Sequence, residues 1–263
     1  MTLEPDPPVL LRADRDGIAW LTMNRPDQRN ALSTGLMAAM QTALDAIASD
    51  KAVRVVVITG AGAGFCAGHD LQEVRSNPTR EFYDALFAQC TRLMLSLNRL
   101  PQPVIAAVNG VASAAGCQLV ATCDLAVAAE SARFATPGVN IGLFCSTPMV
   151  ALSRAVGRKA AMEFLLTGDL VPAEQALAFG LVNRVVADME LRTHVAALAR
   201  KIASKSPLTL KMGKEAFYRQ IDMDLAAAYA HTSQVMTQNM LAHDAEEGID
   251  AFLQKRPPVW TGG

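Results

Sequence analysis

The sequence is poor in cysteine and has no paired-cysteine motif. Its five cysteines are odd in number and show neither a C-x-x-C motif nor a combined cysteine and histidine spacing, so we expect no disulfide framework and no metal site. Basic runs are also missing, because the 24 Lys and Arg residues are scattered singly and the net charge is −1. Nucleic acid is therefore not an expected partner.

Long apolar runs and a recognisable leader are missing too. The longest apolar stretches, such as residues 104–108, are far short of the ~20 residues that span a bilayer, so we expect no membrane insertion. The N-terminal segment 1–17 is acidic and proline-rich, without the order of a secretory signal or the composition of a transit peptide. These features favour a cytoplasmic protein.

What the chain does contain is enough apolar sequence for one large domain. It has 263 residues, of which 51% are hydrophobic, and strand-like and helix-like segments alternate up to about residue 187. Ser33 is a candidate N-cap for a helix with an apolar stripe. From Leu191 onward the pattern is almost wholly helical, with a break at Pro207. Strands are expected at residues 17–23, 53–58, 104–108, 125–129 and 181–186.

We therefore divide the chain into a core of residues 1–200 and a helical region of residues 201–263. The helical region is more apolar than an isolated surface helix requires. Packing against another subunit and packing within the chain both explain this excess, and the spacing does not decide between them. The apolar residues concerned are Met212, Ala216, Phe217, Tyr218, Leu225, Tyr229, Met236 and Met240.

Two loops rich in small residues follow buried strands. In the first, Thr59–Asp70, a dinucleotide fingerprint would need a third glycine where Phe65 stands, although Glu81 is spaced as a ribose-binding acid. In the second, Asn109–Leu119, small residues lead into a helix. Free amides at that helix start suit a developing negative oxygen, but tight helix packing explains the same composition.

Several blocks of sequence resemble the enoyl-CoA hydratase/isomerase (crotonase) superfamily in order and spacing. They are F-C-A-G-x-D at residues 65–70, P-V-I-A-A-V-N-G at 103–110, A-G-C-x-L with C-D at 115–124, and T-P-G-V-N-I-G-L at 136–143. Within the superfamily, A-A-G-C-Q-L-V and G-L-F-C-S-T-P are typical of one branch. The resemblance implies an α/β fold of repeated ββα units wound into a spiral, with a C-terminal helical trimerisation region.

The resemblance also implies a ligand and a site. The ligand is a coenzyme A thioester, bound as substrate and not as a permanent cofactor, and the assembly is a homotrimer or a hexamer made of two trimers. The backbone N–H groups of His69 and Ala115 would form an oxyanion hole for the thioester carbonyl. Phe252 and Lys255 would come from a neighbouring subunit, with a packed Phe and a surface Lys as the plain alternative. The predicted coenzyme A contacts are Asp27, Gln28, Arg29, Ala31, Ala67, His69, Asp70, Leu71, Phe252 and Lys255.

The chain departs from the superfamily at both catalytic glutamates of a hydratase. Gln118 and Gly138 stand at these positions, and neither can exchange a proton near neutral pH. The gap at Gly138 is a candidate place for bicarbonate, which some relatives recruit as a base. The His69 imidazole is another candidate, unless it is an exposed loop histidine. Asp70 more simply caps a helix, and Cys145 is a small buried hydrophobe.

Hydration of a 2-enoyl-CoA, as in fatty-acid metabolism, is the function that these observations favour, and we expect an enoyl-CoA hydratase-like lyase. The alternatives are an acyl-CoA-binding pseudoenzyme, double-bond isomerisation and thioester hydrolysis. Since the chain shows the resemblance but no transit-peptide composition, we expect a bacterial protein of the cytoplasm.

Overall fold

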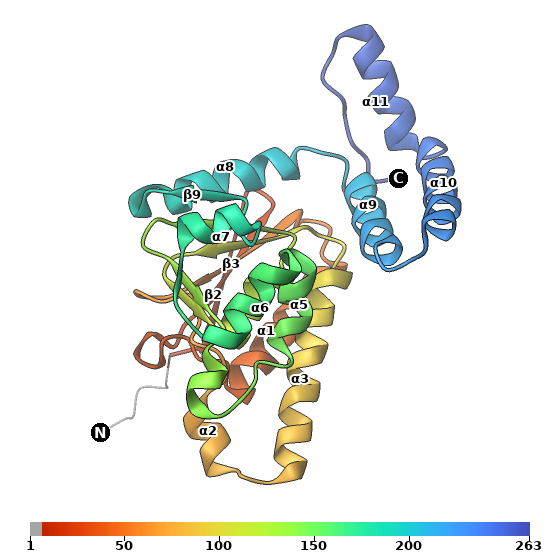
Figure 1. The fold of residues 1–263 in the computed structure, drawn as a ribbon. Helices are drawn as coiled ribbons and strands as arrows, with labels where there is room; N and C mark the ends of the chain where they lie inside the picture. Colours follow the sequence, from red (N-terminus) through yellow and green to blue (C-terminus); the bar gives the residue numbers. More distant parts are fainter. Residues whose placement is uncertain (1–6) are drawn as a thin grey trace.

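A computed structural model describes residues 7–263 and has a six-stranded sheet at its centre, in the order β1-β2-β3-β4-β6-β9 (Figure 1). β1 and β2 form an antiparallel hairpin, and the other neighbouring strands are parallel. Residues 1–6 of the segment used for the targeting interpretation lie outside the described residues. The strands are β1 Leu10–Arg15, β2 Ile18–Met23, β3 Val55–Gly60, β4 Val104–Val108, β6 Leu125–Ala129 and β9 Arg184–Val186.

A second, smaller sheet lies beside the first and has the order β5-β7-β8. Its strands are β5 Val111–Ser113, β7 Arg133–Ala135 and β8 Val171–Pro172. β4 runs into β5 and then into helix α4, while β6 runs into β7 and then into a helical segment. This order confirms the predicted α/β fold of repeated ββα units.

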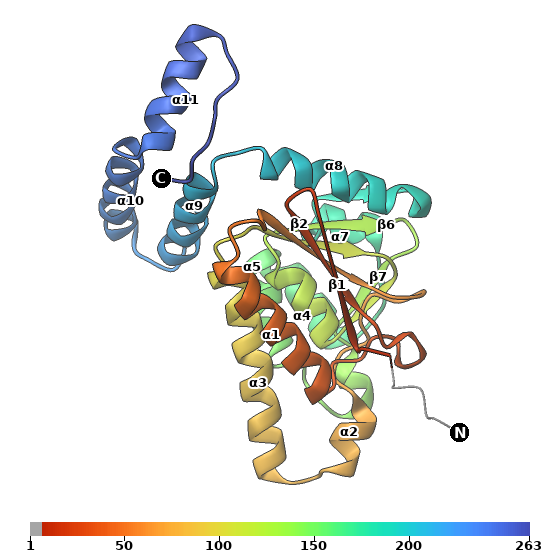
Figure 2. The ribbon, with the colours of Figure 1, turned by 180° about the vertical axis from the view of Figure 1, so that it is seen from behind.

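Helices cover both faces of the large sheet. α1, α3 and α4 share one apolar core with it, whereas α8 packs on the opposite face against Trp20 and Val57 (Figures 1 and 2). α1 begins where the sequence predicted, because the Ser33 hydroxyl accepts a hydrogen bond from the Leu36 N–H at 3.1 Å. The helices of the core are α1 Thr34–Ser49, α2 Leu71–Ser76, α3 Arg80–Arg99, α4 Ala115–Thr122, α5 Pro148–Ala155, α6 Arg158–Thr167, α7 Ala173–Phe179 and α8 Leu191–Ala203, with 3-10 turns η1 Pro26–Gln28, η2 Pro137–Ile141 and η3 Asp188–Glu190.

Three further helices, α9 Pro207–Gln220, α10 Leu225–Met240 and α11 His243–Gln254, extend beyond one end of the sheet (Figure 1). Pro207 is the first residue of α9, as its position in the sequence indicated. Packing within the chain buries Ala216 but leaves Leu225 and Tyr229 exposed by 74% and 68%. Most of the apolar excess of this region is therefore not explained by contacts within one chain.

Two elements differ from the sequence-based expectation. β1 was not anticipated, because its outer face is exposed and its apolar content is low. The apolar run at 181–186 pairs as a strand only from Arg184, while Leu181 and Val182 are buried in the core ahead of it. An apolar run reports burial, and burial alone does not distinguish a strand from a packed loop. No helix in residues 7–263 combines the length and apolar character needed to cross a membrane.

Candidate active site

The two small-residue loops are joined by backbone hydrogen bonds. The N–H groups of Phe65 and Cys66 both donate to the Val111 carbonyl, at 3.1 and 3.0 Å, and the Ser113 N–H donates to the Cys66 carbonyl at 2.9 Å. Phe65 and Cys66 are completely buried. Phe65 therefore fills the position where a dinucleotide fingerprint needs a glycine, and the loop serves as part of a packed junction.

The second loop turns sharply into helix α4. Ala114 has a positive φ of 49° and donates its N–H to the Ala135 carbonyl at 2.9 Å. A positive φ is unusual for alanine and is held by the surrounding contacts. Ala115, the next residue, is fully buried and opens α4. Its N–H is one of those that a helix leaves without an internal partner.

The backbone at His69 lies against this helix start. A Cβ placed on Gly68 would be 3.3 Å from the Ala115 nitrogen and 2.9 Å from the Ala114 Cβ. The bridge between Leu32 and His69 uses the Gly68 carbonyl, at 2.7 Å, and the Asp70 N–H, at 3.2 Å. Within residues 7–263, the N–H groups of His69 and Ala115 donate no hydrogen bond. Two neighbouring amides are thus free to bind an oxygen.

A partly buried ion pair holds this arrangement on the side of the Asp27–Ala31 segment. Arg25 contacts Asp70 at 2.8 Å, and their side chains are 17% and 12% exposed. Arg25 also donates to the Ala31 carbonyl at 2.6 Å. Asp70 additionally accepts hydrogen bonds from the Gln72 and Glu73 N–H groups, which confirms its predicted role as the N-cap of α2.

Most of the predicted coenzyme A contacts come together around this pair. The Ala67 N–H donates to the Arg29 carbonyl at 3.0 Å, so segments 27–31 and 67–71 lie side by side. In these segments Asp27, Gln28, Arg29 and Leu71 are exposed, and Ala31 is buried. Phe252 and Lys255 belong to the exposed end of α11, among the helices that extend beyond the sheet (Figure 1). Their contribution to the site of a neighbouring subunit stays a prediction.

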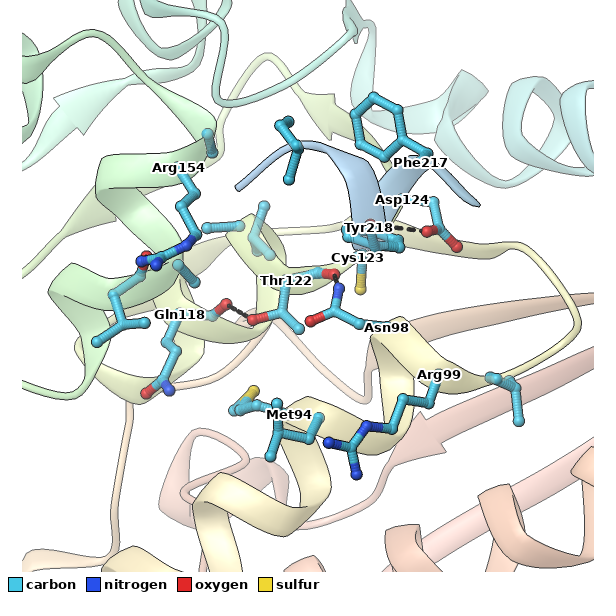
Figure 3. A pocket seen from close by; sticks show the side chains of 18 of the residues that line it. Met94, Asn98, Arg99, Gln118, Thr122, Cys123, Asp124, Arg154, Phe217 and Tyr218 are labelled. Atoms are coloured by element: carbon cyan, nitrogen blue, oxygen red, sulfur yellow. Dashed lines mark hydrogen bonds between the residues drawn. The ribbon is translucent and has the colours of Figure 1, made fainter. Parts of the chain in front are cut away.

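Gln118 lies one turn into α4 and is only 6% exposed. It contributes to the wall of a cavity of about 1190 Å³ between α3, α4, α5 and α9, in which Met94, Arg154 and Tyr218 also face inward (Figure 3). His69, Ala115 and Gly138 do not line this cavity. Gln118 lines this cavity from α4, the helix that begins at Ala115.

Gly138 is buried in η2, and its surroundings leave no room for a side chain. A Cβ there would be 2.7 Å from the Leu143 carbonyl oxygen and 2.9 Å from the Cys145 Sγ. The expectation of a gap for bicarbonate is therefore wrong, since backbone and a thiol occupy that space. Burial raises the pKa of Cys145, which keeps the thiol protonated and agrees with its prediction as a small buried hydrophobe. Asn140, two residues on, is exposed.

The His69 side chain is partly buried, which corrects the expectation of an exposed loop histidine. Its ring meets Phe87 edge-on at 5.8 Å between centroids, and among residues 7–263 neither ring nitrogen has a hydrogen-bond partner. Burial lowers the pKa of His69 below its ordinary value of 6.5. The imidazole is consequently neutral at pH 7 and can accept a proton.

This shift has a consequence for stability. The folded chain binds a proton at His69 less readily than the unfolded chain does. The contribution of the neutral His69 imidazole to the free energy of unfolding is therefore complete above pH 6.5. It is lost as the pH falls through the lower pKa of the folded state. We expect NMR titration to give His69 a midpoint below 6.5, and His69→Gln to weaken the fall in unfolding free energy on acidification. A midpoint at or above 6.5 would contradict the burial argument.

Two residues of the site were missed by sequence reasoning. Asn30 is fully buried, accepts from the Arg25 N–H at 2.9 Å and donates to the carbonyls of Ala61 and Gly64 at 2.9 and 2.8 Å. It thereby fixes the first loop. Its signal was the R-P-x-x-x-N-A-L block at residues 25–32. Thr136 is also fully buried, and its signal was the T-P-G-V-N-I-G-L block, which it opens.

Comparison with known proteins gives one consistent family. The family model described as enoyl-CoA hydratase/isomerase matches residues 13–263. Human enoyl-CoA hydratase domain-containing protein 3, mitochondrial, is 46% identical over 98% of this chain and 85% of its own length. The 2,3-dehydroadipyl-CoA hydratase of Escherichia coli is 36% identical over 96% of this chain and 98% of its own. The first of these belongs to the branch indicated by the A-A-G-C-Q-L-V block.

Solved structures agree with the sequence relatives. An enoyl-CoA hydratase of Mycobacterium smegmatis superposes with a TM-score of 0.95 at 53% identity, covering 97% of this chain and 99% of its own. The human enoyl-CoA hydratase domain-containing protein 3 gives a TM-score of 0.93 at 46% identity, covering 96% of this chain and 100% of its own. The spiral of ββα units and the C-terminal helices are therefore those of the crotonase fold.

The predicted location in a bacterial cytoplasm is contradicted. Relatives from human, rat, mouse and Xenopus that are 42–46% identical to the chain are named as mitochondrial proteins. Composition near one end of a chain is a weak guide to compartment, because relatives named as mitochondrial and relatives from bacteria share this folded domain. On sequence and fold together, the chain belongs to the enoyl-CoA hydratase/isomerase family.

Proposed function

We propose that the chain binds an acyl-CoA thioester and holds its carbonyl oxygen between the N–H groups of His69 and Ala115. The observation that carries the proposal is the pair of neighbouring amides that donate to no partner in the described part of the chain, one of them at the buried start of α4. Such donors stabilise the negative oxygen of an enolate more than the neutral carbonyl, and the helix dipole has the favourable sign. Hydration of a 2-enoyl-CoA is the reaction that we assign to this site.

The coenzyme A moiety would lie along Asp27–Ala31 and residues 67–71, which are already held together by Arg25 and Asp70. The names of the relatives, which include enoyl-CoA and 2,3-dehydroadipyl-CoA hydratases, support a coenzyme A thioester as ligand. Exposed apolar side chains on α10 support a homotrimer or a hexamer, in which Phe252 and Lys255 of one subunit would approach the ligand of the next.

A second candidate function is acyl-CoA binding without hydration. It is favoured by the surroundings of Gly138, where the Leu143 carbonyl and the Cys145 sulfur exclude a catalytic side chain. Gln118 can hold a water molecule by hydrogen bonds but cannot remove its proton. In the hydratase proposal, the neutral His69 imidazole is the group in this site that can accept a proton near pH 7.

Binding measurements with a matched pair of ligands test the carbonyl contact. Butyryl-CoA and the thioether S-butyl-CoA have the same chain length, but the thioether lacks the carbonyl. Two amide hydrogen bonds are worth about 2 kcal/mol together, so calorimetry should give about 30-fold tighter binding of the thioester. Equal affinities for the two ligands would refute the proposed oxyanion contact, and free coenzyme A serves as the reference for the shared part.

Turnover of crotonyl-CoA distinguishes the two candidate functions. Hydration removes the conjugated double bond and its absorbance, so the reaction can be followed directly. Turnover well above the uncatalysed rate supports the hydratase, whereas tight thioester binding without turnover supports the binding protein. If the chain binds butyryl-CoA and S-butyl-CoA equally well and does not turn over crotonyl-CoA, both candidate functions are rejected.

A further inference from the structure

The cavity between α3, α4, α5 and α9 combines apolar side chains with two arginines, Arg99 and Arg154 (Figure 3). Ligand pockets typically have this composition, in which apolar walls hold the body of a ligand and a few polar groups recognise one end of it. An apolar ligand with an anionic end would match both features. The apolar residues that line the cavity include Met94, Leu95, Val120, Ala121, Val150 and Ala151.

Charged side chains are distributed unevenly over the walls of this cavity. Asp124 lines it next to α4 but is already paired with Lys214 at 2.6 Å. α3 and α5 contribute only Arg99 and Arg154, neither of which forms an ion pair within residues 7–263. The walls made by α3 and α5 therefore carry uncompensated positive charge. The charged residues of α9 at the cavity balance one another and are Lys211, Glu215, Arg219 and Asp222.

Arg154 has the geometry of a carboxylate-binding residue. It lies on the face of α5 that lines the cavity, one turn after Val150 and Ala151. One guanidinium N–H donates to the Val150 carbonyl at 3.2 Å, and in the described part of the chain this is the only hydrogen bond of the side chain. A guanidinium has five N–H donors, and two of them can bind both oxygens of one carboxylate. Arg154 therefore has donors left for an anion.

The position of the cavity favours the acyl chain of the thioester as its occupant. In the proposed function the Ala115 amide binds the carbonyl oxygen, and α4 begins at this residue. Gln118, which lines the cavity, comes three residues later, about 4.5 Å along the helix axis. The carbonyl end of an acyl chain would thus lie within about one helical turn of the cavity wall. The distal carbons are the part of the ligand that would reach Arg154.

We propose that Arg154 binds a carboxylate at the far end of the acyl chain, so that the substrate class is the coenzyme A thioester of a dicarboxylic acid. The inference rests on the proposed function, because the carbonyl held at Ala115 sets where the acyl chain begins. The methylene groups of such a ligand lie against the apolar residues of the cavity. Its carboxylate supplies the negative charge that the walls of α3 and α5 lack.

The test compares dicarboxylic thioesters with plain thioesters of the same length by calorimetry. The pairs are adipyl- with hexanoyl-CoA, suberyl- with octanoyl-CoA, and sebacyl- with decanoyl-CoA. In the pair whose length fits, the wild type should bind the dicarboxylic thioester about 5-fold or more tightly, a modest ratio because Arg154 is exposed to solvent. Arg154→Gln removes the charge and should bring this ratio to 1 or below. Arg154→Lys should keep part of it, since an ammonium group attracts the carboxylate without binding both oxygens.

Arg158→Gln is the matched control. Arg158 opens α6, is exposed like Arg154 and does not line the cavity, so this variant should keep the wild-type ratio. Equal affinity within all three pairs, or a ratio that survives Arg154→Gln, overturns the inference alone. Absence of binding by all six thioesters overturns the proposed function and the inference with it.

Discussion

Gly68→Ala is expected to lower the rate of crotonyl-CoA hydration by about 10²- to 10³-fold, the loss typical of one oxyanion donor. The added Cβ would lie 2.9 Å from the Ala114 Cβ and 3.0 Å from the Ser113 carbonyl oxygen. Gly68 also has a φ of +96°, which is strained for alanine. The backbone must therefore shift at residue 68, and this shift displaces the N–H group of the next residue, His69. The same variant should lose most of its preference for butyryl-CoA over S-butyl-CoA.

Gly35→Ala provides the matched control for this substitution. Gly35 lies in the first turn of α1, where the nearest atom to an added Cβ is the Ser33 hydroxyl at 3.9 Å. Its activity and ligand preference should equal those of the wild type. If Gly68→Ala keeps both full turnover and the thioester preference, then the His69 amide is not part of the site. Circular dichroism and thermal unfolding separate this result from a general loss of structure.

The largest effect on stability is expected for Lys214→Ala, at about 3 to 5 kcal/mol in the free energy of unfolding. Lys214 on α9 contacts Asp124 at 2.6 Å, and its side chain is only 8% exposed. Its ammonium group also donates to the carbonyls of Leu97 and Gln102 at 2.9 and 3.0 Å. Without the Lys214 ammonium group, the negative charge of the Asp124 carboxylate has no neighbouring positive charge to compensate it.

Chemical denaturation measures this effect, and Lys211→Ala on the same helix is its control. Lys211 is exposed and takes part in no ion pair within residues 7–263, so its substitution should change the unfolding free energy by less than about 0.5 kcal/mol. A similarly small effect for Lys214→Ala would show that the ion pair does not secure α9 to the core. Asp124 would keep two hydrogen-bond donors, the Tyr218 hydroxyl at 2.8 Å and the Val104 N–H at 2.7 Å, but neither carries a positive charge.

Local sequence patterns were enough to locate most of the elements that carry the site. The β-branched runs at 53–58 and 104–108 are buried strands, and the small residues after them form the two loops. The Ser33 and Asp70 caps were predictable because a side-chain oxygen at a helix start acts on amides only two or three residues away. Neighbouring residues determine these features, so the sequence alone reveals them.

Other features depended on contacts between segments far apart in the chain. Asn30 reaches Gly64, Lys214 reaches Asp124, and Thr136 reaches the start of α4 through Ala135. None of these pairs is marked by spacing, because the sheet register brings them together. The absence of a side chain at Gly138 was visible in the sequence. That the space is filled by the Leu143 carbonyl and Cys145 was not.

The sequence by itself determined the strand and helix pattern, the two loops, the loss of both glutamates and, through its motif blocks, the family. These properties depend on residue identity and short spacing. The tertiary structure decided that the amides of His69 and Ala115 lie together, that the His69 ring is shielded and that Gln118 faces a cavity. Those properties depend on how the ββα units pack against one another, and packing is a property of the whole chain.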